Sequence, residues 1–599
     1  MILQALNRYY ERKAASGELA PDGFERKEIP FVIVVDDKGH LVQIDDTRTV
    51  EGKNKRARSF LVPLGVKKSV NIDANLLWGN LEYLLGIPDA KKLEEKKKGG
   101  KERDYRDRLV SMQNAFVGVI RSRLHSVLDD AGVAAVLAFL EAPDMDRWAS
   151  DARWIDVGSA NLAFRLATDR EDMLVSSRPS VVNALRRPAE ADATALNGTR
   201  SICLVSGDDA DIARLHPAIK GVWDAQTSGA NIVSFNRAAF NSYAKEQNFN
   251  APVGEQAAFN YTTALNHLLR KDSPQRIQIG DASTAFWSAE DSPFEDSFAA
   301  LFGAVEKDDP DRGVRAVRNL LTAMQTGVYL GADAQARFHV LGLAPNAARI
   351  AVRFWHSGPV RDFAQNIGQH FQDIAIDKPA YESSYLSLPK LLNSIALLNK
   401  AENVPPDLAG DTMRAILTGL PYPAMLLQAA IRRGRAEREI SFARAAIIKA
   451  SLNRFIRAGQ FNAKELTVSL DKTNPDPGYR LGRLFATLER IQLAAQPGIN
   501  ATIRDRYYGA AGSSPASVFP VLLRLKNHHL GKLDNAGLVV WYERLLGEVI
   551  GGIATFPAQL SLLQQGQFAI GYYHQQQDFF AGKAKTDTDA DSTRPSGEQ

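Results

Sequence analysis

The pattern of apolar residues changes near residue 360, and this change constrains the fold more than any other feature of the sequence. Before it, short strand-like apolar runs alternate with polar loops, namely "FVIVV" (31–35), "LVQI" (41–44), "SICLV" (201–205), "NIVSF" (231–235), "RIQIG" (276–280), "STAFW" (283–287) and "ARIAVRFW" (348–355). After it, apolar residues recur at helical spacing and strand signals nearly vanish. The sequence therefore predicts an α+β N-terminal part with short mixed or antiparallel sheets, followed by an α-helical C-terminal bundle.

A chain of 599 residues is too long for one hydrophobic core, and size scaling suggests roughly 3–4 domains. We expect an α+β region over 1–360, subdivided near 110–200, then a helical region with a basic face over 361–467. A C-terminal helical bundle over 468–580 and a disordered tail over 581–599 follow, because the tail lacks large apolar residues.

Local patterns predict several elements inside these regions. Apolar spacing indicates helices over 2–15 and 255–270, and the turn residues between 35 and 41 indicate a hairpin. Segment 53–71 is rich in Lys, Arg, Gly and Pro and is expected to be an exposed basic loop. Segment 171–200 is poor in apolar residues and is expected to be a surface loop.

Cysteine usage and hydropathy exclude some classes of protein. Cys203 is the one cysteine, so no intramolecular disulfide and no zinc site of several cysteines can form. The N-terminus carries charges before any long apolar run, unlike a signal peptide, and no apolar run reaches the roughly 18 residues that span a bilayer. We expect a cytoplasmic protein with no membrane partner.

Positive charge is concentrated in the C-terminal half. Eight basic residues lie between Ile431 and Arg457, opposed only by Glu437 and Glu439. Such clustering suits a polyanion, although a solvated helix face would look the same. The candidates for strand or duplex binding are Arg432, Arg433, Arg444, Lys449, Arg454 and Arg457.

No motif of a known catalytic or cofactor site is found, so no catalytic residue, metal ligand or cofactor is assigned. "VSGDD" places Asp208 and Asp209 after a strand-like run, where paired carboxylates can bind a metal or simply form a turn. His216 lacks a nucleophile or orienting acid at a diagnostic spacing. A metal-dependent nuclease using Asp208 and Asp209 stays open as an alternative.

The segment "QTSGANIVSFNRAAFNSYAKEQNFNAP" (226–252) holds five asparagines, together with Tyr243, Lys245 and three phenylalanines. Asn and Gln can read a base edge with two hydrogen bonds, lysine holds phosphates, and aromatic rings stack on bases. The other interpretation is a loop whose amides cap turns and helix ends. The candidates for DNA contact are Gln226, Ser228, Asn231, Ser234, Asn236, Tyr243, Lys245 and Asn250.

Several long motifs, in the same order, make the chain similar to a known family. They are "MILQALNRYYER" (1–12), "CLVSGDDADIARLHPAIKGVWDAQTSGANIVSFNRAAFNSYAKEQNFNAPV" (203–253), "HVLGLAPNAARIAVRFW" (339–355), "RAAIIKASLNR" (444–454), "YRLGRLFATLERIQ" (479–492), "NATIRDRYYGAAGSSPASVFPVLLRLKNHHL" (500–530) and "GYYHQQQDFF" (571–580). The chain resembles, from residue 1 to about 580, the large subunits of type I-C CRISPR interference complexes, also called Cascade.

The resemblance implies a non-catalytic large subunit of a crRNA-guided antiviral ribonucleoprotein. It implies recognition of the protospacer-adjacent motif in double-stranded DNA, help in opening the duplex and stabilising the R-loop, and recruitment of the helicase-nuclease. The implied partners are the backbone subunits, the subunit that binds the crRNA 5′ end, and a small subunit. Lys67, Lys68 and Lys220 become candidates for backbone contacts or for a wedge. A purely structural scaffold subunit is the remaining alternative.

The resemblance also implies that the helical C-terminal part is made separately as a small subunit from an internal start. "LTVSLDKTNPDPGYRLGRLF" has a Pro-rich, turn-like break at 471–478, and Val468 can be encoded by GTG, an alternative start codon. We expect the small product, which suits a small helical bundle, to begin at Val468.

Overall fold

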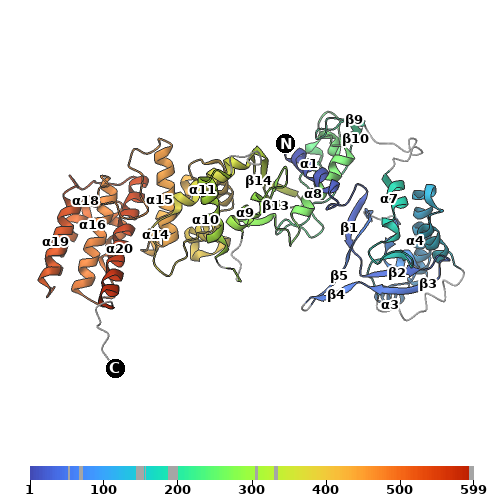
Figure 1. Ribbon diagram of the computed structural model, residues 1–599, viewed down its shortest axis with the longest axis horizontal. Coiled ribbons are helices and arrows are strands. Elements are labelled where there is room, and N and C mark those ends of the chain that lie inside the picture. Colours follow the sequence, from blue (N-terminus) through green and yellow to red (C-terminus); the bar gives the residue numbers. More distant parts are fainter. Residues whose placement is uncertain are drawn as a thin grey trace, which may run out of the picture. The chain divides into compact units, whose positions relative to one another are not determined.

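The computed structural model describes residues 1–51, 54–66, 72–142, 154, 157–186, 200–303, 308–309, 311–328, 335–347 and 349–591. The chain divides into two compact units, each described below by itself (Figure 1). The first unit comprises Met1–Leu6, Leu215–Phe240 and Ala264–Gln599, and the second comprises Asn7–Arg214 and Asn241–Thr263. The predicted boundaries at 361 and 468 both fall inside the first unit and stay predictions.

The main sheet of the second unit has the strand order β3-β2-β8-β7. Strand β2 (Phe31–Val35) pairs antiparallel with β3 (Leu41–Asp46) and parallel with β8 (Leu162–Leu166), and β7 (Trp78–Gly79) is antiparallel to β8. Every residue of β2 is buried, because one face packs on helices α4 (Glu102–Arg123) and α5 (Ala131–Leu140) and the other on a small cluster around Val62 and Trp78. Burial on both faces explains why "FVIVV" shows no polar alternation.

The turn between β2 and β3 confirms the predicted hairpin. Asp36 Oδ1 accepts the backbone N–H groups of Lys38 at 3.0 Å and His40 at 2.7 Å. Gly39 closes the turn at φ +82°, where a Cβ would also lie 2.7 Å from Phe139 N. A side chain at this position would therefore be both strained and too close to α5.

The remaining elements of the second unit correct two sequence predictions. They are β1 (Phe24–Glu28), β4 (Arg48–Glu51), β5 (Asn54–Ala57), β6 (Ser59–Pro63), β9 (Arg200–Ile202), β10 (Asp209–Asp211), α2 (Leu81–Leu84), α3 (Ala90–Lys98), α7 (Pro179–Arg186) and the 3₁₀ turns His125–Val127 and Val175–Ser177. Residues 54–63, expected in a basic loop, form β5 and β6, because Phe60 and Val62 supply a buried face and β6 pairs with β1. Segment 171–200, expected to be a loop, contains α7, which buries Val181.

The first unit contains an antiparallel sheet in the order β11-β12-β13-β14. Its strands are β11 (Arg276–Ile279), β12 (Ala282–Ser288), β13 (Arg337–Asn346) and β14 (Arg349–Pro359). Phe286 and Phe338 pack with Phe298 of helix α9 (Phe294–Phe302) and Phe363 of helix α11 (Val360–Ile374). The strands expected at 276–280, 283–287 and 348–355 are confirmed, whereas "NIVSF" forms only an isolated bridge between Asn231 and Arg349.

After β14 the first unit is predominantly helical, which confirms the predicted helical C-terminal part (Figure 1). They are α10 (Arg312–Gln325), α12 (Leu388–Ile395), α13 (Pro406–Thr418), α14 (Ala424–Glu437), α15 (Phe442–Arg457), α16 (Pro477–Ala495), α17 (Ile503–Ala511), α18 (Pro515–Leu530), α19 (Ala536–Ile550) and α20 (Leu562–Asp591), with 3₁₀ turns at Leu397–Asn399 and Ala401–Asn403. Helix α20 continues past residue 581 into the predicted tail, and 592–599 lie outside the described residues. Helices α1 (Ile2–Ala15) and α8 (Glu255–Leu268) lie where the sequence predicts helices.

Candidate nucleic-acid interface

The amide-rich segment contains no regular strand, and its two halves belong to different compact units. Residues 226–240 belong to the first unit and 241–252 to the second. Two short 3₁₀ turns, Ala238–Phe240 and Gln247–Asn250, are the helical elements within 226–252. The two halves therefore form two surfaces, and each is considered separately.

Asn231 ties the first half to the start of strand β14. Its Nδ2 donates to the carbonyl oxygens of His216 at 3.0 Å and Pro217 at 3.2 Å. Its own carbonyl accepts the N–H of Ile350 at 3.0 Å, next to the parallel bridge with Arg349. The Asn231 amide thus holds the backbone in place, which is the second role that the sequence left open for these asparagines.

Arg349 brings the candidate residues of the first half together. One of its terminal nitrogens donates to Asn236 Oδ1, and its guanidinium carbon lies 4.3 Å from the centre of the Phe240 ring. Asn236 is exposed, and Phe240 is 37% exposed. We call Asn236, Phe240 and Arg349 the Arg349 cluster. Arg349 was not among the predicted site residues, because it lies 113 residues beyond Asn236 and no local pattern connects them.

The second half forms a tight loop around the side chain of Asn250. Asn250 Oδ1 accepts the N–H of Ser242 at 2.8 Å, while Nδ2 donates to the carbonyl oxygens of Lys245 at 3.0 Å and Gln247 at 2.9 Å. We call residues 241–250 the Asn250 loop. The side-chain amide of Asn250 is thus bonded within the loop itself. The amide of Asn231 is likewise bonded to backbone carbonyl groups.

Tyr243 projects from the Asn250 loop. Its side chain is 96% exposed, and its backbone has φ +52°, followed by Ala244 at +55° and Gln247 at +48°. Left-handed backbone is costly for residues with side chains, particularly bulky ones, and such strain persists only where the surroundings enforce it. The hydrogen bonds of Asn250 supply that constraint, so the loop presents an exposed tyrosine beside the exposed Lys245.

The other candidates of this region lie on the surface in less organised positions. Gln226 and Ser228 are exposed and lie in a turn. The turn is closed by a hydrogen bond of 2.9 Å, in which Gly229 N–H donates to Gln226 O. Ser234 is half-buried. Lys220 is exposed, and its backbone N–H donates to Asn266 Oδ1 at 2.7 Å. Trp223, which the sequence analysis did not single out, is 57% exposed nearby in the chain. Lys67 and Lys68 lie outside the described residues.

Three of the C-terminal basic candidates are buried and have structural partners. Arg444, Lys449 and Arg454 on α15 are each 3% exposed. Arg444 Nε donates to Ser394 O at 2.7 Å and Lys449 Nζ to Asp373 O at 2.8 Å. Arg454 Nε donates to Asp373 Oδ2, also at 2.7 Å. The expectation of a solvated or strand-binding face does not fit these three side chains, because α15 is covered on nearly all sides. They are not part of the proposed interface.

The other basic candidates are more accessible. Arg432 is exposed, whereas Arg433 pairs with Glu437 on the same helix. Arg457, with its side chain 35% exposed, bonds to Asp373 Oδ1 at 2.6 Å and Glu465 Oε2 at 3.1 Å. Within the described part of α14 and α15, Arg432 therefore remains the candidate whose charge faces solvent without an ion pair.

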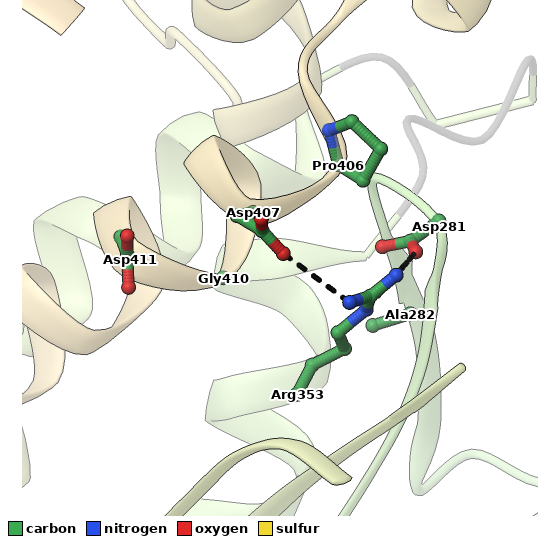
Figure 2. Close-up of a pocket in the computed structure, with 7 residues that line it drawn as sticks. All are labelled: Asp281, Ala282, Arg353, Pro406, Asp407, Gly410 and Asp411. Carbon is green, nitrogen blue, oxygen red and sulfur yellow. Dashed lines mark hydrogen bonds and ion pairs between the residues drawn. The ribbon is translucent and has the colours of Figure 1, made fainter. Parts of the chain in front are cut away.

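A polar pocket of about 230 Å³ lies between the sheet of the first unit and α13 (Figure 2). Arg353 of β14 bridges two of its aspartates, with Nη2 2.6 Å from Asp281 Oδ2 and Nη1 3.2 Å from Asp407 Oδ1. Asp411 lies one turn further along α13. The arginine ties the β11–β12 turn to the start of α13, so the pocket marks a structural joint between the sheet and this helix.

The paired carboxylates Asp208 and Asp209 lie at the β9–β10 hairpin. Asp208 O accepts the N–H of Cys203 at 2.8 Å, and Gly207 closes the turn at φ +85°. Asp209 forms an exposed ion pair with Arg200 at 3.1 Å. Across the described residues, no group of three or more His, Cys, Asp or Glu side chains is placed to hold a metal ion.

Comparison with known proteins bears on what these surfaces serve. The family described as CRISPR-associated protein (Cas_Csd1) matches the chain over residues 6–580. The chain belongs to this family. It is accordingly a CRISPR-associated protein, a large subunit of Cascade type that assembles with other Cas subunits, and such subunits are generally non-catalytic. No curated protein matches the chain.

Membership fits the extent of the resemblance seen in the sequence, because the match covers the chain up to the predicted tail. It also means that exposed surfaces of this Cas_Csd1 protein are to be considered as surfaces of a subunit in an assembly. Among the described helices, none combines the length and the hydropathy that a bilayer-spanning helix requires.

Proposed function

We propose that this Cas_Csd1 protein reads the protospacer-adjacent motif in double-stranded DNA, helps to open the duplex and stabilise the R-loop, and recruits the helicase-nuclease. The proposal rests on one observation above all, the convergence of Asn231, Asn236 and Phe240 on Arg349. Arginine contacting guanine with two hydrogen bonds is the commonest specific base contact in the major groove. A guanidinium held by a planar ring and an amide loses little side-chain freedom on binding.

Asn231 and Asn236 have distinct roles in this proposal. Asn231 fixes the backbone beside Arg349, so it is a positioning residue. Asn236 offers its Oδ1 to Arg349, and its exposed amide can contact the neighbouring base edge through Nδ2. Gln226, Ser228 and Ser234 remain candidates for contacts at the edge of the same surface.

The Asn250 loop supports the proposed duplex opening. An exposed aromatic ring on a preformed loop can stack on a base or enter between base steps, and Lys245 can hold the adjacent phosphate. We propose that Tyr243 makes the stacking contact. Lys67, Lys68 and Lys220 stay proposed backbone contacts, and Arg432, Arg433 and Arg457 stay proposed contacts to the displaced strand or the guide–target duplex.

The experiment that tests motif reading uses the assembled crRNA complex with and without this subunit. Two target duplexes differ only in the flanking motif, and their affinities are measured at one fixed salt concentration. We expect discrimination only when the subunit is present. Discrimination that persists without it would leave the subunit a scaffold or a nuclease adaptor.

The residue-level test compares Arg349→Ala and Asn236→Ala with a matched control, Arg318→Ala. Arg318 is exposed on α10 of the same unit and belongs to neither surface. Loss of a two-hydrogen-bond base contact should reduce discrimination between the duplexes by about 1–3 kcal/mol in the first two variants. Unchanged discrimination in both would remove the Arg349 cluster from the proposal.

The proposed small subunit is tested at the level of the gene. Val468 lies in the segment between α15 and α16, and a product that begins there would contain α16 to α20. A synonymous change of the Val468 codon to one that cannot start translation should abolish the small product. Its persistence would place the start elsewhere.

A further inference from the structure

Helix α3 (Ala90–Lys98) is a solvated helix that contributes no buried residue to any core. A nine-residue helix is shorter than the roughly 12–15 residues at which isolated helices become even marginally stable in water. Its position therefore depends on the half-buried Leu93, which packs against the core of the second unit, and on polar contacts at its start.

Those contacts converge on the buried carboxylate of Glu82 in α2. Glu82 Oε2 accepts from Lys92 Nζ at 2.8 Å, and Glu82 Oε1 accepts from the Tyr105 hydroxyl at 2.6 Å. The same hydroxyl accepts the N–H of Asp89 at 3.2 Å, and Asp89 caps α3 by accepting the N–H of Lys92. Burial and the bond to Glu82 raise the pKa of Tyr105 above its usual range, so this hydroxyl stays protonated. The start of α3 is thus held against α2 and the first turn of α4.

The end of α3 carries a compact group of lysines. Lys96, Lys97 and Lys98 form its last turn, and Lys101 follows a turn in which Gly100 has φ +67°. The N–H of Lys101 donates to Lys96 O at 2.9 Å and that of Gly100 to Lys97 O at 3.1 Å, which closes a left-handed C-terminal cap. We call Lys96, Lys97, Lys98 and Lys101 the α3 lysine tip.

The charge of this tip is not neutralised locally. All four side chains are exposed, and among the described residues none of them forms an ion pair with a carboxylate. Two of the other five basic side chains in segment 91–108 form ion pairs, Lys92 with Glu82 and Arg106 with Glu102. Segment 91–108 contains nine basic and five acidic residues, a net charge of +4, equal to that of the whole chain.

We propose that the α3 lysine tip binds the phosphate backbone of nucleic acid, as a contact separate from the surfaces that read the motif. Lysine ammonium groups bind phosphates as point charges, and a group of them on one positioned turn matches the dense charge of a duplex. The turn bears no amide or aromatic side chain that could read a base, so the contact is independent of sequence. The inference rests on the proposed function only in taking DNA as the polyanion.

A competing explanation assigns the lysines a role in helix stability alone. Cations at a helix C-terminus interact favourably with the partial negative charge of its last carbonyl groups. If this explanation holds, removal of the lysine charges lowers the stability of α3 but leaves DNA binding unchanged. The two explanations therefore differ in the salt dependence of binding.

The experiment uses the assembled complex with Lys96, Lys97 and Lys98 all changed to Gln. The matched control changes Lys271, Lys472 and Lys532 to Gln, which removes the same charge from exposed lysines elsewhere. Affinity for a target duplex and for one that lacks the flanking motif is measured from low to physiological salt. Each lost phosphate contact should lower the slope of log affinity against log salt by about 0.9.

We expect the Lys96/Lys97/Lys98 variant to lose affinity equally for both duplexes and to reduce the slope by about 1–3, with replacement by Arg at the three positions restoring it. Tyr105→Phe should also weaken binding, together with faster amide exchange across α3. A slope that matches that of the control variant would overturn the inference. If the unmodified complex binds both duplexes with equal affinity, that result contradicts the proposed motif reading. The test of the salt slope remains valid in that case.

Discussion

Arg454 and Asp373 form a buried ion pair, with Arg454 Nε 2.7 Å from Asp373 Oδ2 and the side chains 3% and 2% exposed. The arginine also donates through Nη1 to the carbonyl oxygens of Ala415 and Leu420, and its guanidinium lies 4.3 Å from the centre of the Tyr422 ring. A single side chain of α15 thus joins α11, α13 and the segment after α13. Removal of Asp373 would leave the Arg454 charge buried without an ion pair, and removal of Arg454 would leave the buried Asp373 with Arg457 alone and two carbonyl oxygens without their donor.

We therefore expect Arg454→Ala to lower the free energy of unfolding by about 3–5 kcal/mol. Urea denaturation of the purified chain measures this change. The control is Arg432→Ala, an exposed arginine of α14, which should change stability by less than about 0.5 kcal/mol. An Arg454→Ala protein of unchanged stability and weakened DNA binding would restore the phosphate-binding role that its burial argues against.

The contact between α16 and α20 depends on glycine at close range. A Cβ at Gly482 would lie 2.0 Å from Phe568 O, and one at Gly571 would lie 2.0 Å from Tyr479 O. Both obstructing atoms belong to the backbone, so a methyl group forces the helices apart. Gly482→Ala should destabilise this helix pair by about 1–3 kcal/mol despite the higher helix propensity of alanine.

Gly547 of α19 supplies the control for that prediction. It is an exposed helical glycine, and a Cβ there would meet nothing within 4 Å. Gly547→Ala should raise stability by up to about 1 kcal/mol, because only the helix propensity changes. Equal effects at both positions, measured by thermal or urea unfolding, would contradict the close packing of α16 on α20.

The Asn250 loop should loosen when its amide is removed. Asn250→Ala loses the bonds to Ser242 N, Lys245 O and Gln247 O, each worth about 1 kcal/mol. We expect faster amide exchange over 242–247 with little change in the unfolding of the rest of the chain. In the assembled complex the variant should open the target duplex more slowly, because Tyr243 is no longer held outward.

Tyr243→Ala separates the ring from the loop that carries it. It should leave amide exchange over 242–247 close to that of the unmodified protein, since the side chain is 96% exposed and makes no contribution to the Asn250 bonds. Slow duplex opening in Asn250→Ala together with normal opening in Tyr243→Ala would assign the loop a role that does not involve stacking.

Buried histidines predict a dependence of stability on pH. Burial lowers the pKa of His574 to about 4, with a contribution from the nearby Lys449 charge, and burial also lowers the pKa of His356 to about 4. An unfolded chain binds protons at these groups near their ordinary pKa of about 6.5, whereas the folded chain does not. Stability from these groups is therefore present above about pH 6.5 and is lost as pH falls toward 4.

The slope expected in that window is about 1.4 kcal/mol per pH unit for each such histidine. Urea unfolding at several pH values between 7 and 4.5 measures it. His574→Gln should remove the contribution of one histidine from this slope, because the glutamine amide does not titrate. The control His125→Gln, at an exposed histidine, should leave the slope unchanged. A steeper fall in His574→Gln would contradict the burial of a neutral imidazole at this position.

Some elements could be predicted from local sequence patterns, because the residues that favour them lie next to one another in the chain. Helix α1, the β2–β3 hairpin and strands β11 and β12 follow from periodicity and turn chemistry that neighbouring residues carry. "NIVSF" has the same apolar composition but forms a loop, because Asn231 binds the carbonyl oxygens of His216 and Pro217 and pairs with a strand more than a hundred residues away. Strand propensity is context-dependent for this reason.

Family membership and the division into strand-rich and helical parts were determined by the sequence alone, since both depend on residue order and spacing along the chain. The roles of individual charges and amides were decided by the tertiary structure. In the sequence, Lys449 and Arg454 indicate a basic helix face. In the structure both side chains are buried and donate to Asp373, which lies some eighty residues earlier in the chain. Arg349 carries no signal in the sequence but becomes the centre of the candidate site. Burial and hydrogen-bond partners come from segments distant in the chain, so only the fold determines which polar side chains remain available to a ligand.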